Sequence, residues 1–142
     1  MAIFLNNKVG FKLNNVDFSN HVTSFTLNRQ ADQIEVTAMG DTARKYVAAL
    51  SADTISVSLL NDDAASGAGS VRATLQAAYG TTVSFSAIQD ASSAVSSTNP
   101  IYTGTVLIDN ITDINGAVSD EAVMDLTLTC NSKTAVATTG TW

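Results

Sequence analysis

The sequence predicts a mainly β fold, an antiparallel β-sandwich or partly open barrel with one flanking α-helix at about residues 70–79. Apolar and small polar residues alternate with a period of two along most of the chain, turn signals separate the alternating runs, and one segment alone has helical start and stop signals. With 142 residues the chain has the size of one domain, so we expect a single β domain over residues 1–142.

The alternating runs place apolar side chains on one face of each predicted strand and hydroxyls on the other. They occupy residues 9–13, 25–27, 34–38, 54–59, 82–86, 101–108 and 122–130. The last two runs are the longest, and Asn115-Gly116 between them is a hairpin signal. We therefore expect these two strands to project as a long ribbon, with the second paired on both sides.

The helix is predicted from its ends and its apolar spacing. Ser70 is a candidate N-cap and Gly80 a C-terminal stop, while Val71, Leu75 and Ala78 share one side. A single helix beside an antiparallel sheet is expected to cover an edge or an open end.

Three segments are predicted to be flexible arms. They are the N-terminus, the small and polar loop 90–100, and the tail 132–142. The tail ends in Trp142, a large apolar group for which two outcomes stay open: docking on a neighbouring subunit, or no attachment at all.

Composition restricts the class of protein. Hydrophobic residues make up 45% of the chain and charged residues 14%, a low share for a soluble monomer, so part of the surface is expected to be covered by other copies. The net charge of −6 argues against tight binding of phosphate backbones, although an acidic wall lets a polyanion slide past. We find neither a secretion signal nor a membrane span, and expect synthesis in the cytoplasm.

Residues for catalysis or metal binding are scarce. The chain has one histidine, His21, expected at the surface, and one cysteine, Cys130, which is in phase with apolar core positions. The acid pairs Asp62-Asp63 and Asp109 with Asp113 follow no calcium-binding pattern. We therefore predict no enzymatic activity, no catalytic residue, no cofactor and no metal site.

Several segments resemble the major tail tube proteins of long-tailed, siphovirus-like bacteriophages. The resemblance rests on residues 34–50, especially 39–46 (Met-Gly-Asp-Thr-Ala-Arg-Lys-Tyr), and on the strand at 53–60, the helix at 70–79, and the stretches 80–85 and 99–104. It implies a β-sandwich subunit in stacked, hexameric rings around an acidic or neutral polar channel that conducts double-stranded DNA into the host. Six copies of net charge −6 would give −36 per ring.

The resemblance also implies a place and partners for the chain. It would lie in the virion tail and contact copies of itself, the tape measure, tail tip and terminator proteins, and DNA as a transient passenger, without membrane insertion.

Two groups of residues are candidate functional positions. The predicted subunit interface contains Asp41, Arg44, Tyr46 and Trp142; the alternative is that Arg44 pairs with Asp41 in its own loop and Tyr46 fills the local core. The predicted channel lining contains the polar-phase positions Glu35, Asp125, Thr127 and Thr129, which in the alternative face outer solvent.

Two other functions compete with the tube subunit. One is a capsid-decorating or adhesive β-sandwich, for which aromatic residues, at 6% of the chain, are few. The other is a hydrolase on a β scaffold that uses His21 and Asp62.

Overall fold

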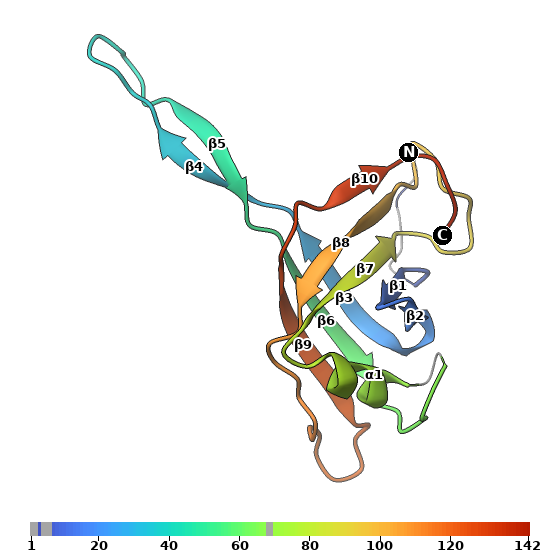
Figure 1. The fold of residues 1–142 in the computed structure, drawn as a ribbon. Helices are drawn as coiled ribbons and strands as arrows, with labels where there is room; N and C mark the ends of the chain where they lie inside the picture. The colour runs from blue at the N-terminus through green and yellow to red at the C-terminus, as the bar shows by residue number, and fades with distance from the viewer. Residues whose placement is uncertain (1–2, 4–6, 68–69) are drawn as a thin grey trace.

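The computed structural model describes residues 3, 7–67 and 70–142. Its main element is one eight-stranded antiparallel sheet, in which seven strands have the order β2-β1-β7-β8-β9-β6-β3 and the eighth, β10, pairs with β8 (Figure 1). Strands β4 and β5 form a separate two-stranded sheet. In chain order the elements are β1 (Gly10–Leu13), β2 (Val16–Asp17), the 3-10 helix η1 (Ser19–His21), β3 (Val22–Asn28), β4 (Ala31–Glu35), β5 (Tyr46–Ser51), β6 (Thr54–Leu60), α1 (Val71–Ala78), β7 (Thr82–Ile88), β8 (Ile101–Leu107), β9 (Val123–Cys130) and β10 (Ala135–Ala137).

The large sheet curls so that its two ends face each other across the core. Phe11 on β1 and Phe25 on β3 lie with ring centroids 5.1 Å apart, although β1 and β3 are not neighbours in the sheet. The core between the two halves includes Leu13, Ile55 and Leu128, all fully buried. The sheet remains open rather than closing into a barrel, so the predicted class, mainly β with a partly open barrel and one helix, is confirmed.

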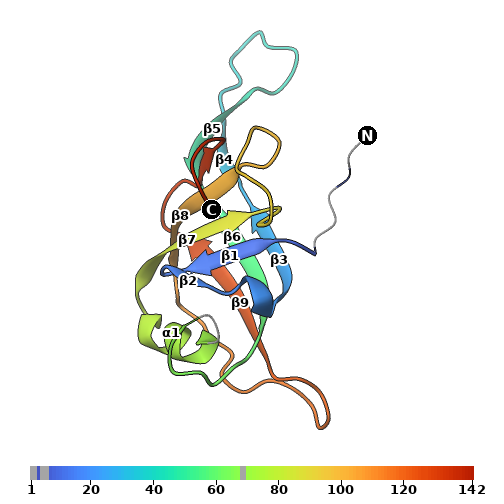
Figure 2. The same ribbon diagram turned by 90° about the vertical axis from the view of Figure 1, so that its right-hand side faces the viewer.

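Helix α1 covers one end of this curled sheet (Figures 1 and 2). Val71, Leu75 and Ala78 are its buried residues, as the spacing predicted, and Gly80 has the positive φ of +79° that a helix stop requires. Ser70 precedes the helix, but its hydroxyl donates to the carbonyl of Gly67 (2.5 Å) and accepts no hydrogen bond from a helical N–H. None of the helices in the described ranges has the length and apolar character needed to cross a membrane.

The predicted ribbon of the last two long strands is only partly formed. Strands β8 and β9 share two paired positions, Val106↔Cys130 and Leu107↔Thr129. Beyond them the chain still runs antiparallel to β9, held largely by side chains: the Asn110 amide donates to the carbonyl of Thr127 (3.4 Å) and the Thr112 hydroxyl to that of Asp125 (2.8 Å). The prediction that β9 is paired on both sides is correct, because β6 lies along its other edge.

The ribbon that does project is formed by β4 and β5. Together with the connection between them they make a hairpin, here called the arm (residues 31–51), which extends away from the sheet at the end opposite α1 (Figures 1 and 2). The prediction placed a half-buried strand at 34–38, but every residue of β4 is exposed. The reason is that no other layer of the described chain covers the hairpin, whose contacts are mainly between its own two strands.

Two of the three predicted flexible arms have defined structure. The 90–100 loop is closed by Asn99, a buried residue whose side-chain amide donates to the carbonyls of Asp90 (2.9 Å) and Ala94 (3.3 Å). The 132–142 tail contributes β10, which pairs with β8. The predicted N-terminal arm falls almost entirely outside the described residues.

Candidate functional site

The strands β3, β6 and β9 carry cross-strand rows of polar side chains on their outward face, here called the hydroxyl face. Because directly opposed residues point to the same side of a sheet, the pairing register assembles these rows. They are Ser24, Ser58 and Asp125; Thr26, Ser56 and Thr127; and Asn28, Thr54 and Thr129. The inward rows between them are apolar, for example Leu27, Ile55 and Leu128. Strict alternation therefore gives this part of the sheet one face packed on the core and one polar, solvent-exposed face.

Asp125 is the only charged residue among these rows, and local donors fix its carboxylate. The Ser58 hydroxyl on β6 donates to Oδ1, and the Asn115 side-chain amide donates to Oδ2 (3.0 Å). Lys and Arg are absent from the three rows, so the face has no cation that could hold a phosphate. The hydroxyl face is thus hydrophilic but only weakly charged.

Three of the four residues predicted to line a channel come together on this face. Asp125, Thr127 and Thr129 are exposed at alternate positions of β9. Glu35 does not join them, because it lies on β4 in the arm, where the Thr37 hydroxyl donates to its carboxylate (3.1 Å). The sequence phase placed the three β9 residues on one face, but it contained no signal that residue 35 belongs to a separate sheet.

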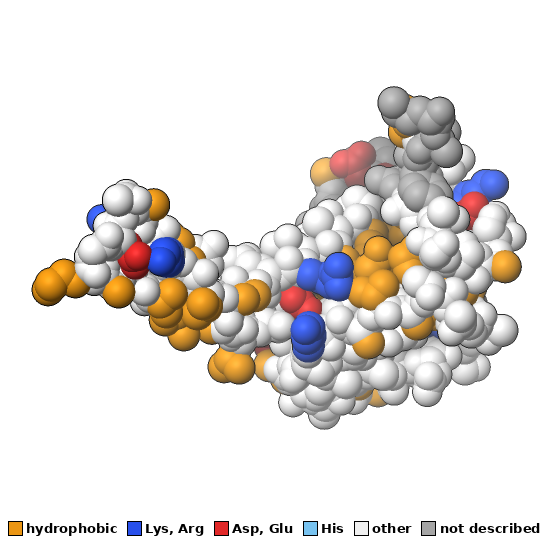
Figure 3. Space-filling view, turned by 90° about the horizontal axis from the view of Figure 1, so that it is seen from above, with side chains coloured by type: hydrophobic (Ala, Val, Ile, Leu, Met, Phe, Trp, Pro, Cys, Tyr) orange, Lys and Arg blue, Asp and Glu red, His pale blue; other side chains and the backbone are white. Residues whose placement is uncertain are grey.

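The arm carries exposed apolar side chains on both of its faces. Ile34 is directly opposite Val47, so these two share one face, whereas Tyr46, opposite Glu35, points to the other. These three side chains are exposed, as is Leu50, at 81%, and Met39 at the tip is fully exposed. Figure 3 shows hydrophobic side chains along the arm. An isolated two-stranded hairpin is only marginally stable in water, and apolar surface of this extent is typical of an interaction site.

Charged residues of the arm pair within it. Lys45 Nζ lies 2.7 Å from Asp41 Oδ1, and Arg44 Nη1 lies 4.0 Å from Glu35 Oε2. The Asp41 pKa is lowered, first by the hydrogen bond from Lys45 and then by the backbone N–H of Ala38. The structure therefore does not show the alternative in which Arg44 pairs with Asp41 and Tyr46 fills the local core. Their role between subunits stays a prediction.

The root of the arm is fastened by a buried carboxylate. Asp53, 3% exposed, accepts the backbone N–H of Gln30 (3.0 Å) and that of Thr134 (2.9 Å), and so joins the start of the arm, its end and the C-terminal tail. Burial alone would raise the Asp53 pKa, but the hydrogen bonds from Thr134 and Gln30 and the charge of Arg29 outweigh it, and the pKa is lowered. Sequence reasoning missed this residue, because a buried acid looks like any turn acid in the sequence.

Trp142 packs against its own chain. A Cβ built on Gly10 would lie 2.5 Å from Cζ2 of the indole, so the ring sits where only glycine leaves room. The Lys12 ammonium lies 4.4 Å from the ring centroid. The tail is therefore attached at Asp53, along β8 and at Gly10, and a contact of Trp142 with a second copy stays a prediction.

His21 and Asp62, the two residues of the hydrolase alternative, do lie together. His21 Nε2 is 3.2 Å from Asp62 Oδ2, and the His21 side chain is mostly buried rather than on the surface as predicted. The Asp62 pKa is lowered, first by the N–H of Ala64 and then by His21. The pair connects η1 to the segment after β6.

Cys130 is half-buried beside the core, and burial followed by the nearby Asp53 charge raises its pKa, which is unfavourable for a reactive thiol. Within the described ranges no group of three His, Cys, Asp or Glu side chains is arranged to bind a metal ion.

The sequence is not matched by any family model or by any curated protein. A solved structure does match, a chain of the "tail of empty GTA particle computed with helical refinement, C6 symmetry". The TM-score is 0.59 at 19% sequence identity, and the alignment covers 84% of this chain and 83% of the other. The chain therefore has a tail-tube-like fold.

Proposed function

We propose that the protein is the structural subunit of a bacteriophage tail tube, assembled from copies of itself into stacked hexameric rings. The observation that carries this proposal is the arm, which exposes apolar side chains on both faces and is covered by no other layer of the described chain. A strand pair of this kind gains stability when other chains cover it. The C6 symmetry of the GTA tail, whose subunit shares the fold, supports six copies per ring.

The hydroxyl face is the proposed lining of the channel. A wall of Ser and Thr with an occasional acid wets easily and has no Lys or Arg to retain a phosphate backbone, so double-stranded DNA passes without being held. With a net charge of −6 per copy, the ring would repel DNA at distances within the screening length of about 8 Å. In this role the chain acts by shape and charge, without catalysis.

This function places the protein in the virion tail and gives it a role in genome ejection. Its contacts there would be further copies along the tube and the tape measure, tail tip and terminator proteins at its ends. The non-contractile, siphovirus type of tail is part of the same proposal, and it rests on the sequence resemblance.

Negative-stain electron microscopy of the purified protein over a range of concentrations tests the proposal. We expect rings and tubes with a central pore, appearing above a critical concentration. A chain that stays monomeric by sedimentation at the highest attainable concentration would rule the proposed function out. Loss of assembly should accompany changes in the arm, whereas replacement of His21 by Gln should leave assembly intact.

A further inference from the structure

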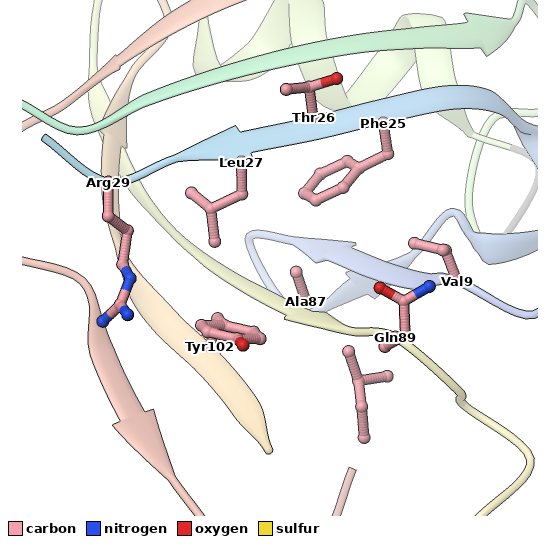
Figure 4. A pocket seen from close by; sticks show the side chains of 9 residues that line it. Val9, Phe25, Thr26, Leu27, Arg29, Ala87, Gln89 and Tyr102 are labelled. Atoms are coloured by element: carbon pink, nitrogen blue, oxygen red, sulfur yellow. The ribbon is translucent and has the colours of Figure 1, made fainter. Parts of the chain in front are cut away.

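The end of the molecule that bears the arm also has a groove, most of whose lining residues have apolar side chains. It lies where the curled sheet stays open, between the end of β3 and the strands β7 and β8, and has a volume of about 370 Å³. Figure 4 shows Phe25 and Leu27 on β3 pointing toward Ala87 and Tyr102 across the groove, with Arg29 beside Tyr102 at its rim. The volume falls within the range of roughly 300–1,000 Å³ that is common for occupied pockets. Figure 3 shows the apolar hollow from this end.

The opposite end bears a loop of complementary character, residues 113–121, between β8 and β9 (Figures 1 and 2). Ile114 and Val118 are almost completely exposed, at 94% and 98%. The base of the loop is fixed, because the N–H of Val123 donates to the carbonyl of Asn115 (3.3 Å) and the Asn115 side chain holds Asp125. The hydrogen bonds at the base of the loop therefore hold the segment that carries these two apolar side chains.

The two ends also differ in charge. The loop contains Asp113, Asp120 and Glu121, and Arg72 is the only Lys or Arg between residues 46 and 132 of the sequence. At the groove, Arg29 is a lining residue and Lys8 directly precedes the lining residue Val9. Asp90, next to the lining residue Gln89 in sequence, is charged as well: the hydroxyls of Ser92 (2.6 Å) and Ser93 (2.9 Å) donate to its carboxylate and lower its pKa, and the Lys8 charge lowers it further. Arg29 is therefore the charged group of the groove lining, and an acidic loop with exposed apolar side chains matches a groove that has apolar side chains and Arg29 at its rim.

We propose that the 113–121 loop of one copy docks into the groove of a second copy, with Ile114 and Val118 in the hollow and the acids near Arg29. The inference rests on the proposed tube function and names the contact that joins one ring to the next. Because the two surfaces differ and lie at opposite ends, the contact is heterologous and repeats without closing, which builds an open stack. The arm then extends past this junction and covers a different surface.

Two variants break the junction from either side. Ile114→Asp with Val118→Asp alters the loop and leaves the groove intact, whereas Arg29→Glu alters the groove and leaves the loop intact. Each variant alone should form rings that do not stack, with the critical concentration for tubes raised at least about tenfold. Mixed, they should form stacks of two rings, because the mixture contains one intact loop and one intact groove. Sedimentation velocity distinguishes single rings, pairs and tubes.

Ala117→Asp is the matched control, since it adds a charge to the same loop without removing a large apolar side chain, and it should form tubes. Val9→Glu is a second groove variant in case Arg29→Glu unfolds, which circular dichroism would show. A direct readout comes from Val9→Cys and Val118→Cys in a Cys130→Ala background, where oxidised tubes should give disulfide-linked ladders. Each single-cysteine chain should give none.

The outcomes separate the two proposals. Tubes of normal length from Ile114→Asp/Val118→Asp would overturn the docking and leave the tube function standing. Cross-linking of Val9→Cys to Met39→Cys rather than to Val118→Cys would assign the groove to the arm and equally overturn it. A wild-type chain that forms neither rings nor tubes would overturn both.

Discussion

The curled sheet and the arm are both antiparallel β structure, yet they use apolar residues in opposite ways. In the sheet, apolar rows such as Leu27, Ile55 and Leu128 point inward and the rows between them are polar. In the arm, apolar side chains lie on both faces, with Ile34 and Val47 on one and Tyr46 on the other. The sheet covers its apolar face within one chain, whereas no other layer of the described chain covers the apolar side chains of the arm. On the proposed function, this difference separates the residues that fold the subunit from those that assemble it.

The same substitution in the two regions should give the largest contrast. Leu128→Ala in the sheet removes a fully buried side chain and should lower the free energy of unfolding by about 2–5 kcal/mol. Leu50→Ala in the arm, where the side chain is 81% exposed, should change it by less than about 0.5 kcal/mol. Urea unfolding of both variants measures the two changes in the free energy of unfolding. Equal losses of free energy would contradict the distinction between the sheet and the arm.

Assembly should show the reverse contrast. Ile34→Asp with Val47→Asp places two charges on one apolar face of the arm and should raise the critical concentration for rings by about 10- to 100-fold. Each side chain is about half exposed, so covering the exposed parts of both together contributes about 1.5–3 kcal/mol. The melting temperature should stay nearly unchanged. Thr42→Asp with Ala43→Asp adds the same charge to the arm without removing large apolar groups, and it should assemble. Sedimentation of the wild type and the two double variants measures their critical concentrations.

Asp53 joins the two regions, and its effect should depend on pH. Asp53→Ala leaves the N–H groups of Gln30 and Thr134 without their acceptor and should cost about 1–3 kcal/mol of unfolding free energy at neutral pH. Because the Asp53 pKa is lowered in the folded chain, its contribution is fully present above the ordinary value of 3.8 and is lost as the pH falls through the folded pKa below it.

The difference in stability between wild type and Asp53→Ala should therefore shrink below about pH 3.8. A difference that grows on acidification would show that the carboxylate is not stabilised in the folded chain. Thermal unfolding at a series of pH values provides the measurement.

The smallest effect on stability should come from the hydroxyl face. Thr127→Lys lies on exposed β9 surface and should change the free energy of unfolding by no more than about 0.5 kcal/mol. In assembled tubes, however, it would add a ring of cations, and short double-stranded DNA should then be retained in a salt-dependent manner. Wild-type tubes should retain little of this DNA. Absence of retention by the variant would argue that Thr127 faces away from the channel.

The fold was predictable where local pattern and final environment agree. Alternation located the strands at β1, β3, β6, β7, β8 and β9, and the Ser70 to Gly80 signals located α1, because each of these elements buries one face inside its own chain. The same alternation at Ile34 predicted burial and was wrong, since no other layer of the described chain covers the arm. On the proposed function a neighbouring copy supplies that layer, and a sequence pattern does not specify which molecule covers a residue.

The candidate site was predictable to a similar extent. The phase of β9 placed Asp125, Thr127 and Thr129 on one face, whereas the rows that complete this face come from β3 and β6 and depend on long-range register. Strand β5 and the anchoring of Trp142 at Gly10 gave no local signal. Both depend on tertiary contacts: pairing with β4 for the first, and the space left by a glycine far away in the sequence for the second.

A helical reconstruction of the assembled protein tests the central claim most directly. If the arm assembles the subunit and the hydroxyl face lines the channel, the map will show Thr127 and Thr129 at the pore and both faces of the arm, including Ile34 and Tyr46, covered by neighbouring copies. A map in which β9 faces outer solvent, or in which the arm lies uncovered along the outside of the tube, would contradict the account.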